Sequence, residues 1–316
     1  MSQWRGTRRF AIFGLLIVLQ AAAAQSGRPQ SLIVARRALS SPPPEQDPSG
    51  ALKHVRLEEI TYMSDGLRIK GYLAMPEGAG PYPAVISNRG GNPNLAVWSD
   101  QSAWRSLGKV ASWGYVVIAS QYRGGGGSEG HDEFGGADVD DVLNLIEVLK
   151  SVPSADTNRI GMSGVSRGGM MTYLALTRTD KIRAAIVTSG LSDLMESSKS
   201  RPELLRVWKN LIPDFDSHME ATLKTRSAIQ WPEKLPANVP VLIIHGTADW
   251  RVSPLQAFDM ARALYTANRP VRFVMYEGGS HGVPEFAAVR DALMRSWLDD
   301  YLRDGKKWPD LKPHGD

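Results

Sequence analysis

Short apolar runs alternate with longer stretches of helical spacing along most of this chain, and this alternation limits its fold more than any other feature. The runs lie at residues 84–87, 115–120, 159–163, 184–188, 239–244 and 271–276. The helical stretches lie at residues 98–113, 137–150, 168–178, 254–267 and 284–304. A strand that is apolar throughout is buried on both faces, and a helix after each strand lets the next one run parallel. Two alternating segments at 57–62 and 67–75 around S-D-G predict an antiparallel hairpin before them. We therefore predict an α/β protein with a mostly parallel twisted sheet and helices on both faces.

The remaining segments are arranged around this pattern. Residues 25–50 are polar and rich in proline and predict a flexible tail, and residues 305–316 predict a short C-terminal tail. Residues 191–237 replace the alternation with helical sequence broken by prolines. This break predicts a small helical cap inserted into one domain at residues 51–304.

The segment 1–24 has the pattern of a secretory signal. Three arginines precede an apolar run at residues 10–19, and three alanines at residues 22–24 supply small side chains for cleavage. The run is too short to span a bilayer, which takes about 20 residues. We expect cleavage after Ala24 and an exported protein, periplasmic or secreted; an uncleaved membrane anchor is the alternative.

Charge and cysteine content exclude several classes of function. The formal net charge is +4, and it falls to +1 without the three arginines of the segment 1–24. A nearly neutral chain lacks the basic surface that nucleic acid or an anionic membrane attracts, so we expect neither partner once the signal is removed. Because the chain has no cysteine, a thiol nucleophile, a disulfide and a cysteine-ligated metal are excluded.

The sequence G-V-S-R-G at residues 164–168 is the most informative motif. It follows a predicted strand directly and precedes a predicted helix, which is the setting in which G-x-S-x-G presents a nucleophilic serine. Ser166 is therefore the candidate nucleophile, whereas Ser163 has Val165 where the second glycine is required. The structural alternative is a glycine turn that only packs the helix closely against the sheet.

A serine nucleophile needs a base and a group that orients the base, in the chain order serine, acid, histidine on this architecture. Asp249 follows one later strand and His281 follows the next one. Parallel strands meet at one edge of a sheet with their carboxyl ends, so Ser166, Asp249 and His281 are predicted to form a triad. His245 ends a strand and is interpreted as a brace for the acid loop. With His281 it lacks a third metal ligand, so no metal is expected.

Backbone N–H groups are expected to stabilise the oxyanion of an acyl-transfer reaction. The residue after the nucleophile, Arg167, supplies one of them, and Gly91 or Gly90 supplies the second. Arg89 is a weak candidate for a substrate carboxylate, and a salt bridge to a loop acid is its structural alternative. Trp250, beside the predicted acid, is a further candidate for substrate contact.

Three stretches together resemble the catalytic domain of the prolyl oligopeptidase (S9) family of serine peptidases. They are G-V-S-R-G-G at 164–169, H-G-T-A-D-W-R-V at 245–252 and G-G-S-H-G at 278–282. The turn Tyr122-Arg123-Gly124 is similar as well and makes Tyr122 a weak candidate for substrate contact. The resemblance covers roughly residues 51–302 and implies an α/β-hydrolase fold with the same triad.

Two departures from the family pattern affect what we expect. Only the segment 25–50 lies between the predicted cleavage site and the first predicted domain, which leaves no room for the N-terminal propeller that filters substrates in family peptidases. The oxyanion loop reads N-R-G-G-N at residues 88–92, where the family has an aromatic residue or histidine before two glycines.

We expect an exported serine hydrolase that forms an acyl-enzyme and needs no cofactor. The favoured activity is a prolyl-oligopeptidase-like peptidase acting on short peptides. A carboxylesterase or deacylase acting on small esters is the alternative, and a catalytically idle module of the same fold is a remote one. The oligomeric state stays open.

Overall fold

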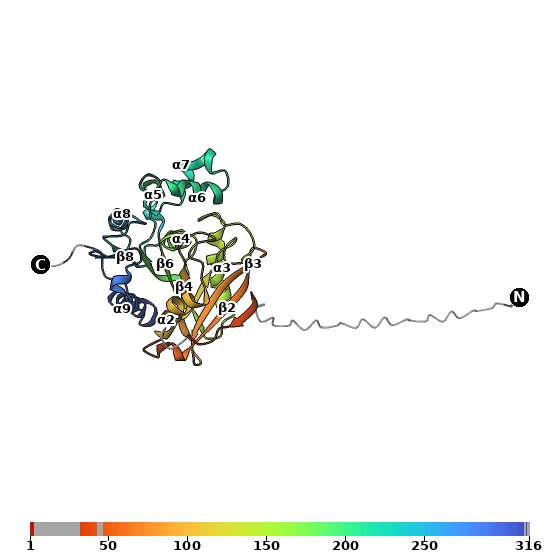
Figure 1. Cartoon of the computed structure of the whole chain (residues 1–316). Coiled ribbons are helices and arrows are strands. Elements are labelled where there is room, and N and C mark those ends of the chain that lie inside the picture. Colours follow the sequence, from red (N-terminus) through yellow and green to blue (C-terminus); the bar gives the residue numbers. More distant parts are fainter. Residues whose placement is uncertain (3–31, 43–46, 313, 315–316) are drawn as a thin grey trace. The chain divides into compact units, whose positions relative to one another are not determined.

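A computed structural model describes residues 1–2, 32–42, 47–312 and 314 of the chain (Figure 1). The chain divides into two units, Met1–Gln30 and Ser31–Asp316, and the fold below is that of the second unit. The predicted signal segment lies outside the described residues, apart from residues 1–2, as does the part of the predicted tail up to residue 31.

Nine strands of the described chain form one mixed sheet, in the order β1-β2-β3-β5-β4-β6-β7-β8-β9 (Figure 1). The pairs β1–β2, β2–β3 and β3–β5 are antiparallel, and every pair from β5–β4 to β8–β9 is parallel. The predicted mostly parallel sheet is thus confirmed. The strand bounds are β1 Ile33–Ala38, β2 Val55–Ser64, β3 Leu67–Pro76, β4 Tyr82–Asn88, β5 Val116–Ser120, β6 Ala155–Val165, β7 Ile182–Thr188, β8 Val241–Gly246 and β9 Val271–Tyr276.

The local sequence explains the two kinds of strand. Every residue of β5 and of β8 is buried. This is expected of strands that are apolar almost throughout and are covered by helices on both faces of the sheet. The hairpin β2–β3 turns at Asp65 and Gly66, whose φ angles of 50° and 82° both lie in the left-handed region. A two-residue turn with both φ angles positive matches the twist of a hairpin.

Helices follow the strands and cover both faces. Their bounds are α1 Asp100–Ala103, α2 Lys109–Ser112, α3 Asp138–Lys150, α4 Arg167–Leu176, α5 Leu194–Ser200, α6 Glu203–Leu211, α7 Phe215–Thr225, α8 Pro254–Thr266 and α9 Ala287–Leu298. The π-helical segments are η3 Trp104–Gly108 and η7 Asp299–Arg303, and the 3₁₀ turns are η2 Ala51–His54, η4 Ala228–Gln230, η5 Pro232–Lys234 and η6 Pro284–Phe286.

Two buried clusters hold these layers together. One cluster joins α3, α4 and α8 to one face of the sheet, and Figure 1 shows α2 and α9 on the other side, where the second cluster lies. Leu145, Met171 and Met260 are buried in the first cluster, and Leu107 and Trp297 in the second. None of the helices in the described part of the chain is long and apolar enough to cross a membrane.

The segment predicted as a cap, residues 191–237, contains α5, α6 and α7 between β7 and β8. These helices lie together beyond α4 and α8, at one end of the unit (Figure 1). Asp193 caps α5 by accepting a hydrogen bond from the N–H of Glu196, at 3.1 Å. Trp208 of α6 is fully buried against Phe134, with ring centroids 6.0 Å apart, which ties the cap to the loop before α3.

Two predictions about elements were wrong. Residues 33–38 were expected within a flexible tail, but they form β1, which pairs antiparallel with β2. Ion pairs from Arg36 to Glu58 and from Arg37 to Glu59, at 2.8 and 2.6 Å, add to this pairing. The predicted helix at 98–113 is also not uniform, because η3 separates α1 from α2.

Candidate active site

Ser166 lies at the turn from β6 into α4 with φ 60° and ψ −124°. This is a sparsely populated conformation for a residue with a side chain, and it costs about 1–3 kcal/mol that the surroundings must offset. Both flanking glycines are required: a Cβ at Gly164 would lie 2.0 Å from the carbonyl oxygen of Gly168, and a Cβ at Gly168 would lie 2.0 Å from that of Asn88. The sharp turn therefore presents the Ser166 hydroxyl at the end of the sheet.

Asp249 and His281 lie in the loops after β8 and β9 and contact each other directly. The Nδ1–H of His281 donates to the two Asp249 oxygens at 3.0 and 2.8 Å. This leaves the Nε2 atom of His281 free to exchange a proton with a hydroxyl. Among the described residues, the Ser166 hydroxyl has no hydrogen-bond partner, and such contacts are often loose before substrate binds.

A chain of hydrogen bonds connects the His281 loop to the serine. The N–H of Ser166 donates to the carbonyl oxygen of Thr188 at 3.1 Å, at the end of β7. The next residue, Ser189, accepts from the N–H of Gly282 at 2.9 Å and so fixes the neighbour of His281. Arg290 holds the same residue from α9, because its Nη1 donates to the Gly282 carbonyl oxygen at 2.6 Å. The three predicted residues therefore lie at one edge of the sheet.

The acid is held in its ionised form. Burial raises the pKa of Asp249, but hydrogen bonds from His245 and His281 and from the N–H of Val252 outweigh it, so the pKa lies well below its usual range. The Nε2 atom of His245 lies 3.2 Å from an Asp249 oxygen and 3.0 Å from the Val252 carbonyl oxygen. As interpreted from the sequence, His245 braces the acid loop.

Gly90 lies directly against the candidate nucleophile. A Cβ at this position would come within 3.0 Å of the Cβ and 3.6 Å of the Oγ of Ser166, so a side chain here would crowd the serine. Gly91 has a φ of 74°, and a Cβ added there would lie 2.0 Å from the Leu95 carbonyl oxygen, in the turn that Asn92 and Leu95 form. Both glycines are therefore required by the close approach of this loop to its neighbours.

The carbonyl groups of this loop are turned inward by two buried side chains. The Nη1 of Arg89 donates to the carbonyl oxygens of Gly90 and Asn92 at 3.0 and 3.1 Å, and the hydroxyl of Tyr122 donates to that of Arg89 at 3.1 Å. In a trans peptide the N–H points opposite to the preceding carbonyl. The N–H groups of Gly90 and Gly91 thus point away from these side chains, and no described residue accepts from them.

Tyr122 was wrongly predicted as a substrate contact, whereas substrate contact by Arg89, which supports this loop, stays a prediction. Arg89 is 3% exposed and pairs with no carboxylate of the described chain; its other donors bind the Gln121 carbonyl oxygen at 3.1 and 2.6 Å. Burial lowers the pKa of Arg89 to about 10, so it is still a cation at neutral pH. Tyr122 is fully buried beneath the loop. No pattern of residues indicated these roles, because the partners are backbone atoms of a loop whose path was unknown.

The buried side chain of Arg167 connects α4 to the loop before α3 and to the glycine loop. The sequence had indicated a role only for its backbone N–H. Its guanidinium contacts Asp132 at 2.8 and 2.7 Å and Asp138 at 2.6 Å, and it donates to the Gly91 carbonyl oxygen at 3.2 Å. Its own N–H lies in the first turn of α4, where backbone donors have no helical acceptor. One residue therefore fixes the start of α4 and the glycine loop together.

Trp250 is 68% exposed, beside the acid. Its ring centroid lies 5.3 Å from the guanidinium group of Arg201 in the cap and 4.9 Å from that of Arg251 in the acid loop. Arg201 also donates to the Arg251 carbonyl oxygen at 3.1 Å. Trp250 thus links cap and acid loop, and a substrate contact by its ring stays a prediction.

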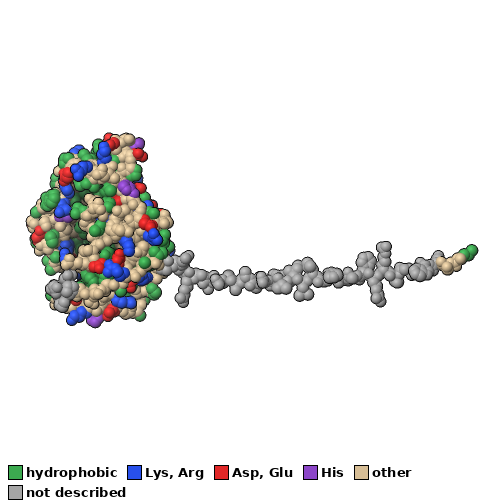
Figure 2. Space-filling view, turned by 45° about the vertical axis from the view of Figure 1, so that its right-hand side comes forward, with side chains coloured by type: hydrophobic (Ala, Val, Ile, Leu, Met, Phe, Trp, Pro, Cys, Tyr) green, Lys and Arg blue, Asp and Glu red, His purple; other side chains and the backbone are tan. Residues whose placement is uncertain are grey.

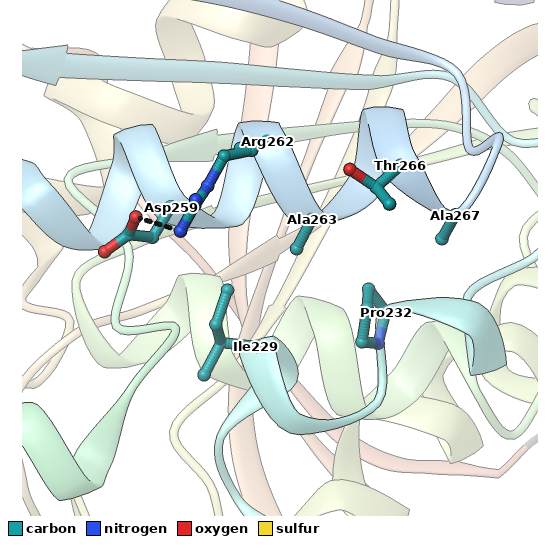
Figure 3. Close-up of a pocket in the computed structure, with 7 residues that line it drawn as sticks. All are labelled: Ile229, Pro232, Asp259, Arg262, Ala263, Thr266 and Ala267. Atoms are coloured by element: carbon teal, nitrogen blue, oxygen red, sulfur yellow. Dashed lines mark hydrogen bonds and ion pairs between the residues drawn. The ribbon is translucent and has the colours of Figure 1, made fainter.

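Two hollows in the surface differ in volume and in their position relative to the predicted triad. A cavity of about 590 Å³ reaches from Gly90 and His281 down between α2 and α9. A groove of about 350 Å³ lies between α8 and the turns η4 and η5 (Figure 3). Its charged residues, Asp259 and Arg262, pair with each other at 3.1 Å, and none of the predicted triad residues lines it. Among the described residues, no group of three or more His, Cys, Asp or Glu side chains could hold a metal ion.

Comparisons with known proteins give one consistent assignment. The model of the prolyl oligopeptidase family matches residues 102–305. The uncharacterized peptidase YtmA of Bacillus subtilis is 32% identical over 233 residues, which are 73% of this chain and 88% of YtmA. Dipeptidyl-peptidase 5 of Porphyromonas gingivalis is 28% identical over 70% of this chain and 34% of its own length.

Solved structures agree at the level of the fold. The acylaminoacyl peptidase of Pyrococcus horikoshii matches with a TM-score of 0.70 and 24% identity, over 82% of this chain and 44% of its own. This likeness shows the α/β-hydrolase fold alone. The chain thus spans most of one relative but less than half of these longer ones.

Proposed function

This chain belongs to the prolyl oligopeptidase family and is a serine hydrolase, and from that membership we propose that it is an exported peptidase acting on short peptides. The observation that carries the proposal is the hydrogen bond from His281 Nδ1 to the Asp249 carboxylate, at 2.8 Å, at the end of the sheet where Ser166 directly precedes α4. A base oriented by a buried carboxylate beside a serine in a strained turn is the arrangement that activates a hydroxyl.

In the first half-reaction, Ser166 Oγ attacks the carbonyl carbon of the scissile bond while His281 Nε2 takes the hydroxyl proton. The negative charge moves to the carbonyl oxygen, where the N–H of Arg167 and that of Gly90 or Gly91 stabilise it. As the intermediate collapses, the C–N bond breaks and His281 transfers its proton to the leaving nitrogen. An amine departs and the acyl group remains on Ser166.

In the second half-reaction, water replaces the amine. His281 takes a proton from the water, whose oxygen attacks the acyl carbon, and the ester bond to Ser166 breaks. The proton on His281 returns to the serine oxygen, which restores the enzyme and releases a carboxylic acid. Asp249 stays ionised throughout, because its hydrogen bonds hold its pKa far below that of a free carboxyl group.

Labelling and turnover test this proposal together. We expect a fluorophosphonate probe to label the wild type at Ser166, and S166A to lose both label and turnover by several orders of magnitude. Ser112→Ala, on α2 and outside the site, is the matched control and should keep both. Label that survives in S166A would place the nucleophile elsewhere.

Substrate class is decided by parallel assays with a peptide library and p-nitrophenyl esters. Cleavage of short peptides by the wild type that disappears in S166A supports the peptidase. Ester hydrolysis with no peptide cleavage would replace it by a carboxylesterase.

A further inference from the structure

The cavity between α2 and α9 begins where the leaving group of the proposed reaction must be. His281 has to reach the leaving nitrogen to protonate it, so the leaving group lies beside His281. The cavity wall contains His281 and continues through Gly282 and Pro284, and it also contains Gly90, which lies against Ser166. Its volume of about 590 Å³ is in the range of small-molecule sites.

Two helix faces form the body of this cavity. Arg105, Lys109 and Trp113 follow one another at a spacing of four along the segment α1–η3–α2, and Arg290 and Met294 do so along α9. Side chains at that spacing lie on one face of a helix. Figure 1 shows α2 and α9 on the same side of the sheet, and the ion pair of Lys109 with Asp291 at 2.8 Å spans them. Trp113, Met294 and Trp98 supply apolar wall.

The charges in the wall are unequal. Lys109 and Arg290 share one carboxylate, Asp291, at 2.8 and 2.7 Å. Arg105 is exposed, and among the described residues its guanidinium group has neither an ion pair nor a hydrogen bond. It also belongs to η3, and π-helical turns inside helices occur frequently at functional sites. In the described wall, four cations (Arg89, Arg105, Lys109 and Arg290) thus face one carboxylate, that of Asp291, and Arg105 is the cation whose side chain has no partner.

We propose that this cavity binds the leaving portion of the substrate and favours leaving groups that carry a carboxylate, as the C-terminal residue of a short peptide does. The apolar wall holds the side chain of that residue and Arg105 binds its carboxylate. This assignment rests on the proposed acyl transfer at Ser166 and adds the class of leaving group to it.

The test compares two peptides with the same acyl part, one releasing phenylalanine and the other phenylalaninamide. We expect kcat/KM of wild type to be about fivefold higher for the free acid, the effect of one partly exposed ion pair. R105Q should bring the two rates to parity and R105E should reverse the preference. The preference should shrink as salt is added. R56Q, on β2 and outside the cavity, is the matched control and should keep it.

An ester pair separates this proposal from the peptidase proposal. Acetate esters of 4-hydroxybenzoate and of 4-hydroxybenzamide differ on the leaving side by one carboxylate, as the two peptides do. The two esters also differ in intrinsic reactivity, so the ratio of their rates is compared between wild type and R105Q, in which that difference cancels. If no peptide is cleaved but R105Q lowers the benzoate-to-benzamide ratio about fivefold, the peptidase proposal fails and the subsite stands. An unchanged ratio in R105Q for both pairs, or a preference that follows a carboxylate on the acyl side, would overturn the subsite.

Discussion

At the scale of single residues, the site depends on side chains that fix other groups as much as on those that react. Asp249 accepts N–H bonds from Arg251 and Val252 at 2.9 and 3.1 Å in addition to the two histidines. These bonds favour the carboxylate, so Asp249 has a pKa below its usual range in the folded protein. Its charge is therefore constant over the pH range in which histidines titrate.

This constancy predicts the shape of the pH profile. Only neutral His281 can accept the serine proton, so kcat/KM should rise with pH along one limb. Because Asp249 does not change its charge there, the limb should have the slope of a single proton in a plot of log kcat/KM against pH. Flat activity from pH 5 to 9 would contradict a histidine base, and a two-proton slope would contradict a permanently ionised Asp249.

Arg89 is predicted to be a positioning residue of the glycine loop. In R89M the carbonyl oxygens of Gly90 and Asn92 lose their donor, so the loop N–H groups that we propose as oxyanion donors lose this support. We expect kcat to fall about 100-fold with little change in KM, as when one oxyanion donor is lost. Binding of a boronic acid transition-state analogue should weaken in parallel, while binding of the product does not. Loss of folded protein with unchanged kcat per folded molecule would show a merely structural role.

At the scale of elements, a buried ion cluster joins α3 and α4 beneath the site. Arg167 of α4 and Asp138 of α3 are fully buried, and the carboxylate of Asp138 also accepts the N–H groups of Gly135 and Gly136 at 3.0 and 2.9 Å. Burial raises the pKa of Asp138, but the charge of Arg167 and these N–H bonds outweigh it and lower the pKa overall. Asp138 contributes its ion pair to this cluster only while it is ionised, and the pair of Arg167 with Asp132 is separate from it.

D138N should therefore destabilise the protein by about 3–5 kcal/mol at neutral pH, because it leaves the charge of Arg167 with one partner fewer. A carboxyl group with a lowered folded pKa contributes stability above its unfolded pKa of about 4 and loses it as pH falls through the folded value. The difference in urea midpoint between wild type and D138N should consequently shrink in acid. D140N changes another carboxylate of α3, whose ion pair with Arg178 is more exposed. This variant should lower the free energy of unfolding by less than about 1 kcal/mol. An equal loss in both variants would refute the cluster's role.

β1 allows an independent test at the far edge of the sheet. A chain starting at Leu39 loses the pairing with β2 and the ion pairs of Arg36 and Arg37. Since β1 is largely exposed, we expect a lower Tm by a few degrees, about 2–4 °C per kcal/mol for a domain of this size. Turnover should not change, because β1 is the outermost strand on the side of the sheet farthest from β9, the strand that His281 follows. Loss of turnover in a chain that remains folded would contradict this.

At the scale of the whole molecule, the predicted export signal also changes the net charge, because the segment 1–24 contains three arginines. Basic and acidic side chains are interspersed on the face shown in Figure 2, consistent with a formal charge of +1 without the segment 1–24. We predict that the protein recovered from the periplasm or medium begins at Gln25, which intact-mass analysis measures. A species that retains Met1 and sediments with membranes would show that the segment is an anchor.

The sequence by itself determined the class of the sheet and the loops that hold the predicted triad. Strands that are apolar on both faces must be covered by helices on both sides of the sheet. Parallel strands place their carboxyl ends at one end of the sheet, so the loops that hold Ser166, Asp249 and His281 were predictable from their positions after strands. The glycines around Ser166 were predictable for the same local reason. A side chain at Gly164 or Gly168 would overlap backbone atoms where the strand turns sharply into the helix.

Only the tertiary structure decided which groups those loops touch. Arg89 binds backbone oxygens, Tyr122 is buried, residues 33–38 pair with a strand, and the cavity beside His281 lies between two helices far apart in the chain. An arginine that binds a carbonyl oxygen and one that binds a substrate have the same sequence signature. The difference lies in contacts between distant segments, whose geometry is fixed by the packing of the whole sheet and not by the spacing of residues along the chain.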